Sequence, residues 1–294
     1  MAILATLIWS GNFIIARGVI KLIPPVSLAF YRWLSASVII FPFAIKSFRS
    51  ERKLISRHWK YFFWLALTGI TLFNTCVYIA GHYSPAINLA LIGTTSSPIF
   101  VILLAAIFLR EKITILQCSG LIICITGIVL LLSKGSMERL LTFRFSTGDW
   151  WILCGAMLFA IYTILVRTKP VSISPINFLF VTFTLGLLLL FPFYIWEVGT
   201  TVPVKWNGKL LLIILYLGFG ASIIAFFCWN ASIAILGSSR TAMFGNLIPI
   251  FSAFEAVVLL DEGITAIYAI SGILVISGLV IANTGMKKIS HNKS

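Results

Sequence analysis

The sequence is poor in charged residues, above all in acidic ones. Aspartate and glutamate together number 8 in 294 residues, and charged residues make up 10% of the chain against 60% hydrophobic residues. A soluble domain carries about 25% charged residues, and no soluble core could bury so much apolar surface. The composition therefore excludes a soluble protein and indicates an integral membrane protein.

Residues that build common catalytic and metal centres are also scarce. There are 3 histidines, and the chain contains no HExxH, GxSxG or phosphate-loop motif. The 5 cysteines lie in apolar stretches without a CxxC pair, which favours packing over metal binding or disulfides. We therefore expect no enzyme, no metal site and no cofactor.

The few charges that are present are mostly positive. The net charge is +14, which in a soluble protein would indicate nucleic-acid binding. In a membrane protein, lysine and arginine gather in the loops, set the orientation of the chain and face anionic lipid. We therefore expect the lipid bilayer, and no nucleic acid, as the partner of these charges.

Long apolar runs dominate the chain. Most of them approach the roughly 20 residues that a helix needs to cross the hydrocarbon. They cover residues 2–20, 26–45, 59–80, 86–109, 113–133, 149–166, 176–196, 209–233, 237–260 and 264–285. The pattern predicts an all-α integral membrane protein with ten transmembrane helices, of which the first is the weakest.

One stretch of the chain occurs twice. Pro98 begins a Pro-Ile-Phe run and Glu111 follows it after thirteen residues; Pro249 and Glu262 repeat this pattern 151 residues later. Five spans per half is an odd number, so the second half must enter the membrane upside down. Inverted repeats are typical of alternating-access transporters, whose substrate site lies at the midplane between the halves.

The loop charges predict the orientation. With a cytoplasmic N-terminus, thirteen Lys and Arg lie on the inner side, seven on the outer side and two within spans, which together make the 22. Six of the inner ones fall between Lys46 and Lys60, which we expect to be a cytoplasmic loop. The excess favours an inner-membrane protein with both termini in the cytoplasm.

Neutral polar and aromatic residues recur in matched spans of the two halves. Such side chains offer hydrogen bonds and flat apolar faces without the cost of a buried charge. We expect them to line a substrate cavity; the alternative is hydrogen bonding between helices or an aromatic belt at the interface. The candidates are Trp9, Asn12, Asn74, Tyr78, Tyr162, Trp229 and Asn246.

The two repeated prolines fall near the middle of their spans. Proline removes a backbone hydrogen bond, and in lipid the freed carbonyl group must find a partner in protein or in a cavity. Pro98 and Pro249 are therefore candidate hinges beside the substrate, with a static kink as the alternative.

Three ionisable residues lie within spans. Charge in hydrocarbon is costly and indicates function, so Arg32, Arg240 and Glu255 are candidate charge partners. The alternative for the arginines is that they reach the interface. Glu255 is a candidate proton carrier, an arginine partner or a neutral group at an interface. No second acid offers a relay, so we expect facilitated diffusion or exchange rather than strict proton coupling.

The fifth and tenth spans are rich in small residues. They carry Gly120 and Gly127, and Gly272 and Gly278, respectively. Small residues let membrane helices approach closely. We expect these spans to support the bundle or to form a homodimer contact, rather than to line the cavity.

Several short motifs together carry a family likeness. They are Trp9-Ser10-Gly11-Asn12-Phe13, Tyr31-Arg32-Trp33, Ser97-Pro98-Ile99-Phe100, Arg110-Glu111-Lys112, Ser239-Arg240-Thr241-Ala242, Pro249-Ile250-Phe251 and Asp261-Glu262. In this order, over nearly the whole length, the chain resembles the EamA type of the drug/metabolite transporter superfamily.

The resemblance implies two inverted five-helix repeats, at 1–135 and 148–286, followed by a cytoplasmic tail at 287–294. It also implies a central cavity lined by helices 1–4 and 6–9, with helices 5 and 10 outside it, and transport of small metabolites, often amino-acid export. One departure is that the family often has Glu directly before the second proline, where this chain has Ile248.

The sequence thus predicts a secondary transporter of small organic metabolites, an amino-acid or amino-acid-like exporter working by alternating access. One alternative is uptake or exchange of a nucleotide or cofactor-like metabolite such as S-adenosylmethionine. Another is a membrane scaffold that transports nothing.

Overall fold

The computed structural model describes residues 1–19, 22–84, 86–142, 144–170, 172–260 and 266–284, and within these ranges its regular structure is helical without strands. In chain order the elements are α1 (Ala2–Gly18), α2 (Pro25–Arg57), α3 (Trp59–Ala66), η1 (Leu67–Leu72), α4 (Phe73–Tyr83), α5 (Ala86–Phe108), α6 (Ile115–Ser133), α7 (Met137–Leu141), α8 (Thr147–Arg167), α9 (Pro175–Thr200), α10 (Gly208–Leu215), η2 (Tyr216–Ile224), α11 (Ala225–Leu236), α12 (Ser238–Met243), η3 (Phe244–Leu247), α13 (Ile248–Leu260) and α14 (Ala266–Thr284).

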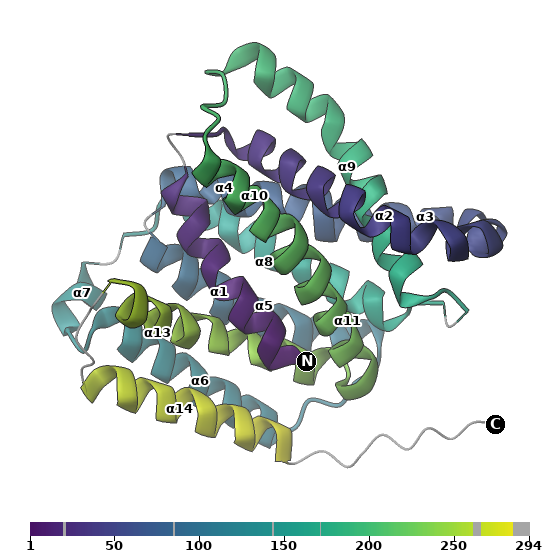
Figure 1. Ribbon diagram of the computed structural model, residues 1–294. Coiled ribbons are helices and arrows are strands. Elements are labelled where there is room, and N and C mark those ends of the chain that lie inside the picture. The colour runs from purple at the N-terminus through teal and green to yellow at the C-terminus, as the bar shows by residue number, and fades with distance from the viewer. Residues whose placement is uncertain (20–21, 85, 143, 171, 261–265, 285–294) are drawn as a thin grey trace.

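These elements form two sets of five membrane-crossing segments, counted over the described ranges, with α7 as a short helix between them (Figure 1). Three segments are composite: α3–η1–α4, α10–η2–α11 and α12–η3–α13. Eight segments are long and apolar enough to cross a membrane. The other two are α1, which has 17 residues, and the divided segment α12–η3–α13. The all-α fold of two inverted repeats is therefore confirmed.

One predicted boundary is wrong. Residues 46–57, expected in a loop, are the last three turns of α2, which ends at Arg57. This stretch is rich in Lys, Arg, Glu and Leu, which are good helix formers. The helix therefore continues beyond the apolar run instead of ending with it.

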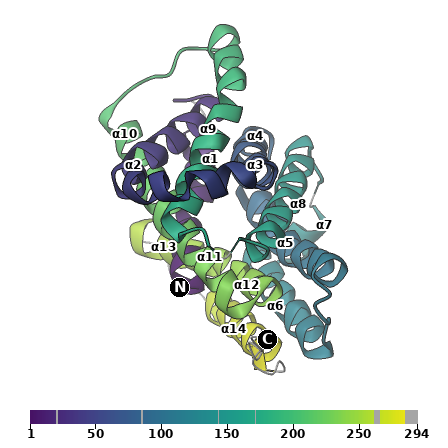
Figure 2. The same ribbon diagram turned by 90° about the vertical axis from the view of Figure 1, so that its right-hand side faces the viewer.

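Helices α2 and α9 are repeat mates that pack against each other, as Figure 2 shows from the side. Near the end of α9, the carboxylate of Glu197 accepts hydrogen bonds from the backbone N–H groups of Val26 and Ser27, at 3.0 and 2.6 Å. Near the end of α2, Glu51 accepts from the backbone N–H of Ser174, at 3.1 Å. Each helix of the pair thus carries, near its C-terminal end, a carboxylate that binds the N-terminal first turn of the other helix. The helix dipole favours an anion at that N-terminal turn.

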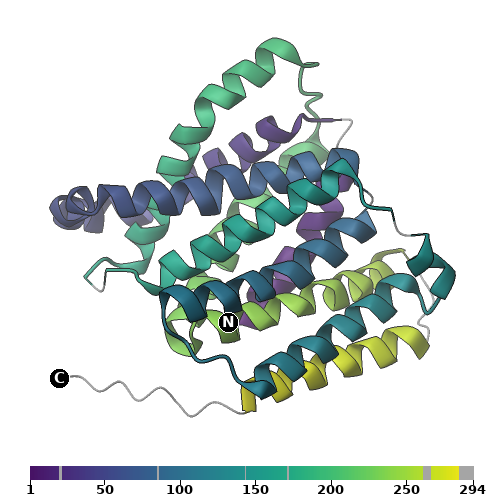
Figure 3. The same cartoon turned by 180° about the vertical axis from the view of Figure 1, so that it is seen from behind.

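Helices α6 and α14 lie side by side at one edge of the bundle (Figures 1 and 3). A Cβ atom added to Gly120 would come within 2.4 Å of the carbonyl oxygen of Gly278, so no side chain fits between these backbones. A Cβ atom added to Gly127 would lie 2.9 Å from Cβ of Leu274 and 3.0 Å from the carbonyl oxygen of Ser271, both in α14. Three of the four glycines singled out in the sequence therefore serve a contact within one chain.

Two π-helical segments, η1 and η2, occupy matching places in the repeats. Gly69 in η1 and Gly220 in η2 lie 151 residues apart. A π-helix replaces the i to i+4 hydrogen bonds of the α-helix by i to i+5 bonds and is frequent at functional sites. Both segments lie in helices that approach the centre of the bundle.

Candidate functional site

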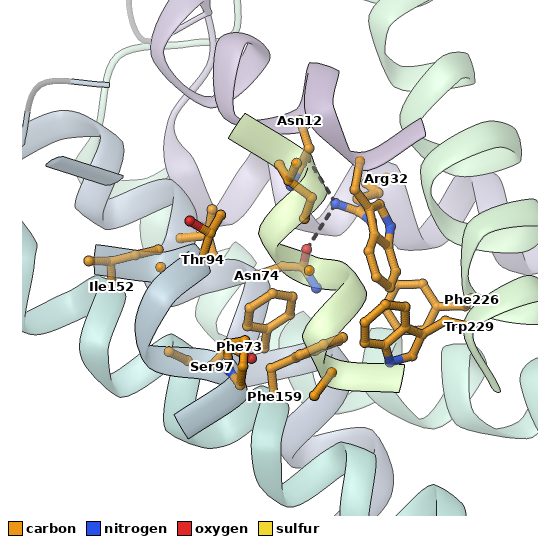
Figure 4. Close-up of a pocket in the computed structure, with 18 residues that line it drawn as sticks. Asn12, Arg32, Phe73, Asn74, Thr94, Ser97, Ile152, Phe159, Phe226 and Trp229 are labelled. Atoms are coloured by element: carbon orange, nitrogen blue, oxygen red, sulfur yellow. Dashed lines mark hydrogen bonds between the residues drawn. The ribbon is translucent and has the colours of Figure 1, made fainter. Parts of the chain in front are cut away.

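A cavity of about 70 Å³ lies at the centre, between the two repeats (Figure 4). Its walls come from α1, α2, α4 and α5 of the first repeat and from α8, α11, α12, η3 and α13 of the second. The lining residues are Trp9, Asn12, Arg32, Phe73, Asn74, Val77, Gly93, Thr94, Ser97, Pro98, Ile152, Ala156, Phe159, Phe226, Trp229, Ala242, Gly245 and Ile248. None of these residues belongs to α6 or α14.

Arg32 organises the polar side of the cavity. Its guanidinium is 1% exposed and donates from Nη1 to Oδ1 of Asn12 at 3.2 Å and Oδ1 of Asn74 at 2.9 Å (Figure 4). Nη1 also lies 3.0 Å from the hydroxyl oxygen of Tyr78, and Nε donates to Oγ of Ser222 at 2.8 Å. Arg32 therefore lies inside the bundle and does not reach the interface.

The carbonyl oxygen of Ala221 completes this cluster from within η2. It accepts from Nη2 of Arg32 at 3.0 Å and from Nε1 of Trp9 at 2.8 Å. The shifted hydrogen-bond pattern of a π-helix frees carbonyl groups that an α-helix would use internally. The second repeat thus holds the arginine of the first repeat through its backbone.

Aromatic rings form the opposite side. The centroids of Trp9 and Trp229 lie 5.1 Å apart, and Phe159 lies 5.6 Å from Trp9 and 5.7 Å from Trp229. The centroid of Phe73 lies 4.8 Å from that of Phe159, with the rings tilted by 34°, and Phe226 lies 5.4 Å from Trp9. These separations are typical of attractive aromatic pairs, so the wall is a packed apolar surface.

The remaining predicted residues lie around this core. Tyr78 stands behind Arg32, and the Tyr162 hydroxyl donates to Oδ1 of Asn230 at 3.0 Å. Asn246 is 0% exposed in η3, and within the described part of the chain neither amide atom has a hydrogen-bond partner. None of these three lines the cavity directly.

The two repeated prolines have different surroundings. Pro98 lies inside the continuous helix α5 and lines the cavity. Pro249 is the second residue of α13, directly after the 3₁₀ turn η3. A proline in a first helical turn lacks only an N–H that has no helical partner. The helix is therefore broken at the second proline and continuous at the first.

Glu255 lies outside the cavity, between α13 and α1. Its Oε1 atom accepts a short hydrogen bond from Oγ of Ser10, and Oγ of Ser252 donates to the Ser10 carbonyl at 3.0 Å. Arg240 lies half-buried in α12, where its neighbour Ser239 donates to Glu111. Glu111 thus fastens α12, in keeping with a structural role, whereas its mate Glu262 lies outside the described residues.

Two larger pockets open toward opposite ends of the bundle. One, of about 870 Å³, is lined by residues that include Pro25, Ile79 and Glu197; the other, of about 560 Å³, by residues that include Pro175 and Asn230. Pro25 and Pro175 are 150 residues apart, and Ile79 and Asn230 are 151 apart, so the two pockets are repeat mates. We call them the first and the second vestibule, respectively.

The second vestibule is the more basic one. It contains Arg167, whose Nη1 donates to the Ala234 carbonyl at 3.0 Å, and Lys169, whose ammonium lies over the ring of Phe178. Burial lowers the pKa of Lys169, while the nearby Glu51 acts in the opposite direction.

Sequence patterns missed several residues of the site: Phe73, Thr94, Ser97 and Phe226 line the cavity, and Ser222 holds Arg32. Ser222 is matched by Thr71, 151 residues earlier, and this repeated hydroxyl beside a glycine was the available signal. The phenylalanines carry no such signal, because the chain has 24 of them.

The sequence profile of the EamA-like transporter family matches residues 1–133 and 146–284. The chain belongs to the EamA-like transporter family. As a member of this family it is a multi-pass membrane transporter of small molecules and not an enzyme.

Relatives of this EamA protein are named as transporters. An uncharacterized transporter of Archaeoglobus fulgidus is 29% identical, over 95% of this chain and 94% of its own. A protein of Escherichia coli K12 named "Probable amino-acid metabolite efflux pump" is 21% identical, over 98% and 95%. A solved crystal structure has the same fold, with a TM-score of 0.75 at 18% identity over 95% of this chain and 94% of that one.

Proposed function

We propose that this EamA protein exports a small amino-acid-like metabolite by alternating access. The observation that carries the proposal is the cavity between two inverted repeats, with a vestibule toward each end of the bundle. Rocking one repeat against the other would open the cavity to each vestibule in turn. A scaffold without transport would need neither a polar cavity nor paired vestibules.

The size of the cavity favours a small substrate. Its 70 Å³ corresponds to about five water molecules, at roughly 10–15 Å³ each on this measure. A nucleotide or S-adenosylmethionine is several times larger, and polyphosphate recognition calls for a cluster of cations. Arg32 is the one arginine or lysine among the lining residues. The name of the Escherichia coli relative supports the same substrate class.

The test is transport in proteoliposomes. Purified protein is offered a panel of radiolabelled amino acids, amino-acid derivatives and S-adenosylmethionine, with empty liposomes as the control. We expect counterflow of at least one amino-acid-like solute. Uptake of S-adenosylmethionine alone would favour the alternative, and absence of flux for the whole panel would contradict the proposal.

We infer that the protein lies in an inner membrane with both termini in the cytoplasm and the repeats at 1–135 and 148–286. The loop charges support this orientation. Single cysteines at Arg49 and at Lys205 test it with an impermeant thiol reagent on intact cells, after replacement of the exposed Cys118 and Cys154. Labelling is expected at position 205 and not at position 49; the reverse pattern would refute the orientation. The predicted tail at 287–294 lies outside the described residues.

We propose facilitated diffusion or exchange rather than strict proton coupling. Glu255 is held by Ser10 at the side of α1 and does not face the cavity. Counterflow and pH-driven uptake are compared for the wild type and Glu255→Gln. Accumulation of substrate by the wild type under a pH gradient alone, lost in Glu255→Gln while counterflow persists, would make Glu255 the proton carrier.

Two further roles are proposals. Pro98 and Pro249 are proposed as hinges, since they stand on the two segments that cross the cavity from opposite repeats. A homodimer through α6 and α14 would have to use their outer faces, because Gly120, Gly127 and Gly278 are occupied within the chain. Gly272 has no neighbour within 4 Å of an added Cβ atom, in the part of the chain that the structure describes, and marks that outer face.

A further inference from the structure

The guanidinium of Arg32 is buried without a carboxylate among its hydrogen-bond partners, in the part of the chain that the structure describes. Among the residues that the structure describes, every hydrogen-bond acceptor of its guanidinium is neutral: two amide oxygens, two hydroxyl groups and one backbone carbonyl. The carboxylates of Glu51, Asp149, Glu197 and Glu255 accept from other groups. A buried positive charge in such surroundings is costly until an anion joins it.

The side chains around Arg32 turn donors toward the cavity. Because arginine only donates, Asn12 and Asn74 must present their amide oxygens to it. Their amide nitrogens therefore point away from the guanidinium, and both residues line the cavity (Figure 4). The amide nitrogen of Asn74 already donates one hydrogen to the Gly69 carbonyl, at 3.5 Å. A solute there meets the remaining N–H donors, backed by a positive charge, which favours an oxyanion.

The aromatic wall adds one more donor. Nε1 of Trp229 is buried without a hydrogen-bond partner in the described part of the chain, and Trp229 lines the cavity. A buried indole N–H without an acceptor costs about 1–3 kcal/mol. An acceptor on a bound solute would remove that cost, while the rings of Trp9 and Phe159 cover an apolar body.

No carboxylate lines the cavity to form an ion pair with an ammonium ion. The 18 lining residues include no aspartate and no glutamate. The positive charge of Arg32 would also repel a cationic solute from the polar side. The site therefore offers an ion-pair partner to a carboxylate and none to an amine.

We propose that the cavity selects a monocarboxylate with a small apolar body, bound through Arg32, Asn12 and Asn74, and that an amino group on the solute is dispensable. This rests on the proposed function, because it assigns the substrate class of the same cavity. The site then accepts apolar 2-amino acids and their deaminated counterparts alike, and it rejects amides and amines of the same shape.

The test measures binding to purified full-length protein with four probes that share one branched side chain: L-leucine, 4-methylpentanoate, L-leucinamide and 3-methylbutylamine. We expect leucine and 4-methylpentanoate to bind within about 5-fold of each other. Loss of a charge-assisted hydrogen bond is worth about 1.5–3 kcal/mol, so leucinamide and the amine should bind about 10- to 150-fold more weakly.

Variants of Arg32 test whether this residue causes the preference for a carboxylate over an amide. Arg32→Gln should bind the acid and the amide equally, and Arg32→Lys should keep part of the preference. Arg49→Gln is the matched control, since Arg49 lies on the same helix but is exposed. If Arg32→Gln fails to fold, the ratio of the wild-type protein's affinities for leucine and leucinamide still tests the proposal.

Equal or tighter binding of leucinamide or of the amine would overturn the proposal, and so would failure of both acids to bind. Proteoliposome flux of any other panel solute would then leave the transport function standing. Absence of all flux, with acid-selective binding intact, would instead contradict the transport function and leave the assignment of the site in place.

Discussion

The two repeats share most of their helical framework but contribute different chemistry to the cavity. The first repeat contributes Asn12, Arg32, Asn74 and Tyr78, which form one hydrogen-bonded cluster. At the matching positions, 150 or 151 residues later, the second repeat has Tyr162, Thr182, Ala225 and Trp229. The charged cluster of the first repeat thus has no counterpart in the second, whereas both repeats contribute aromatic rings to the cavity.

This difference shows which parts of a duplicated protein are interchangeable. The helix pairs, the π-helical segments and the vestibules recur in both repeats, because they serve the bundle and its motion. The polar cluster around Arg32 does not recur, although Trp9 is matched by Phe159 and both line the cavity.

The largest expected effect is a difference in stability between alanine substitutions at the two π-helical glycines, Gly69 and Gly220. A Cβ atom at Gly69 would lie 2.1 Å from Cδ2 of the Tyr162 ring, whereas at Gly220 the nearest neighbour would be 3.6 Å away. Overpacking costs about 1–3 kcal/mol, and occasionally more. Gly69→Ala should lower the thermal unfolding temperature and the folded yield in detergent, while Gly220→Ala should leave both near wild type. Equal sensitivity at both positions would contradict this asymmetry.

An intermediate effect is expected for Asn12→Ala. The variant removes one amide from the cluster around Arg32, and a lost substrate hydrogen bond costs about 1–3 kcal/mol, or roughly 5- to 150-fold in affinity. Transport should fall while expression stays normal, as measured by counterflow per folded protein. Asn283→Ala is the control, because this amide lies in α14, away from the cavity, and donates to the carbonyl of Leu279 in its own helix. An Asn12→Ala variant with wild-type flux would remove Asn12 from the site.

The smallest effect compares two tyrosine hydroxyls. The Tyr78 hydroxyl accepts from the charged Arg32, and that of Tyr162 donates to the neutral Asn230. Bonds to charged groups contribute about 1.5–3 kcal/mol and neutral ones about 1 kcal/mol. Tyr78→Phe should therefore destabilise the protein more than Tyr162→Phe in thermal unfolding. A larger decrease in the unfolding temperature for Tyr162→Phe than for Tyr78→Phe would mean that the stronger polar contact lies in the second repeat.

Sequence reasoning reached the fold because membrane helices leave strong local signals. Apolar length and the repeated proline spacing predicted ten spans and their inversion. The boundary at Lys46 was missed, since helix propensity extends past the lipid and hydropathy does not record it. The segment around Asn246 was expected as one span with a hinge or kink at Pro249, and the structure divides it at η3, directly before the turn that contains this proline.

The cavity was less accessible from the sequence. Trp9, Asn12, Asn74 and Trp229 were singled out and line it, although contact with a substrate stays a prediction. The central place of Arg32 could not be derived, because its partners include the backbone carbonyl of Ala221. That carbonyl is available through the shape of η2, and sequence patterns do not report which backbone groups a π-helix frees.

The contact between α6 and α14 has a consequence for the origin of the chain. Gly120 lies against Gly278 and Gly127 against Ser271. The repeat relates Gly120 to Ser271 and Gly127 to Gly278, both 151 residues apart, so the two contacts exchange under the repeat. Such a surface is self-complementary. A single five-helix ancestor could have made the same contact with a second copy of itself inserted in the opposite orientation. In such a dual-topology dimer, each copy would have taken its orientation by chance. Gene fusion would then have fixed one half in each orientation.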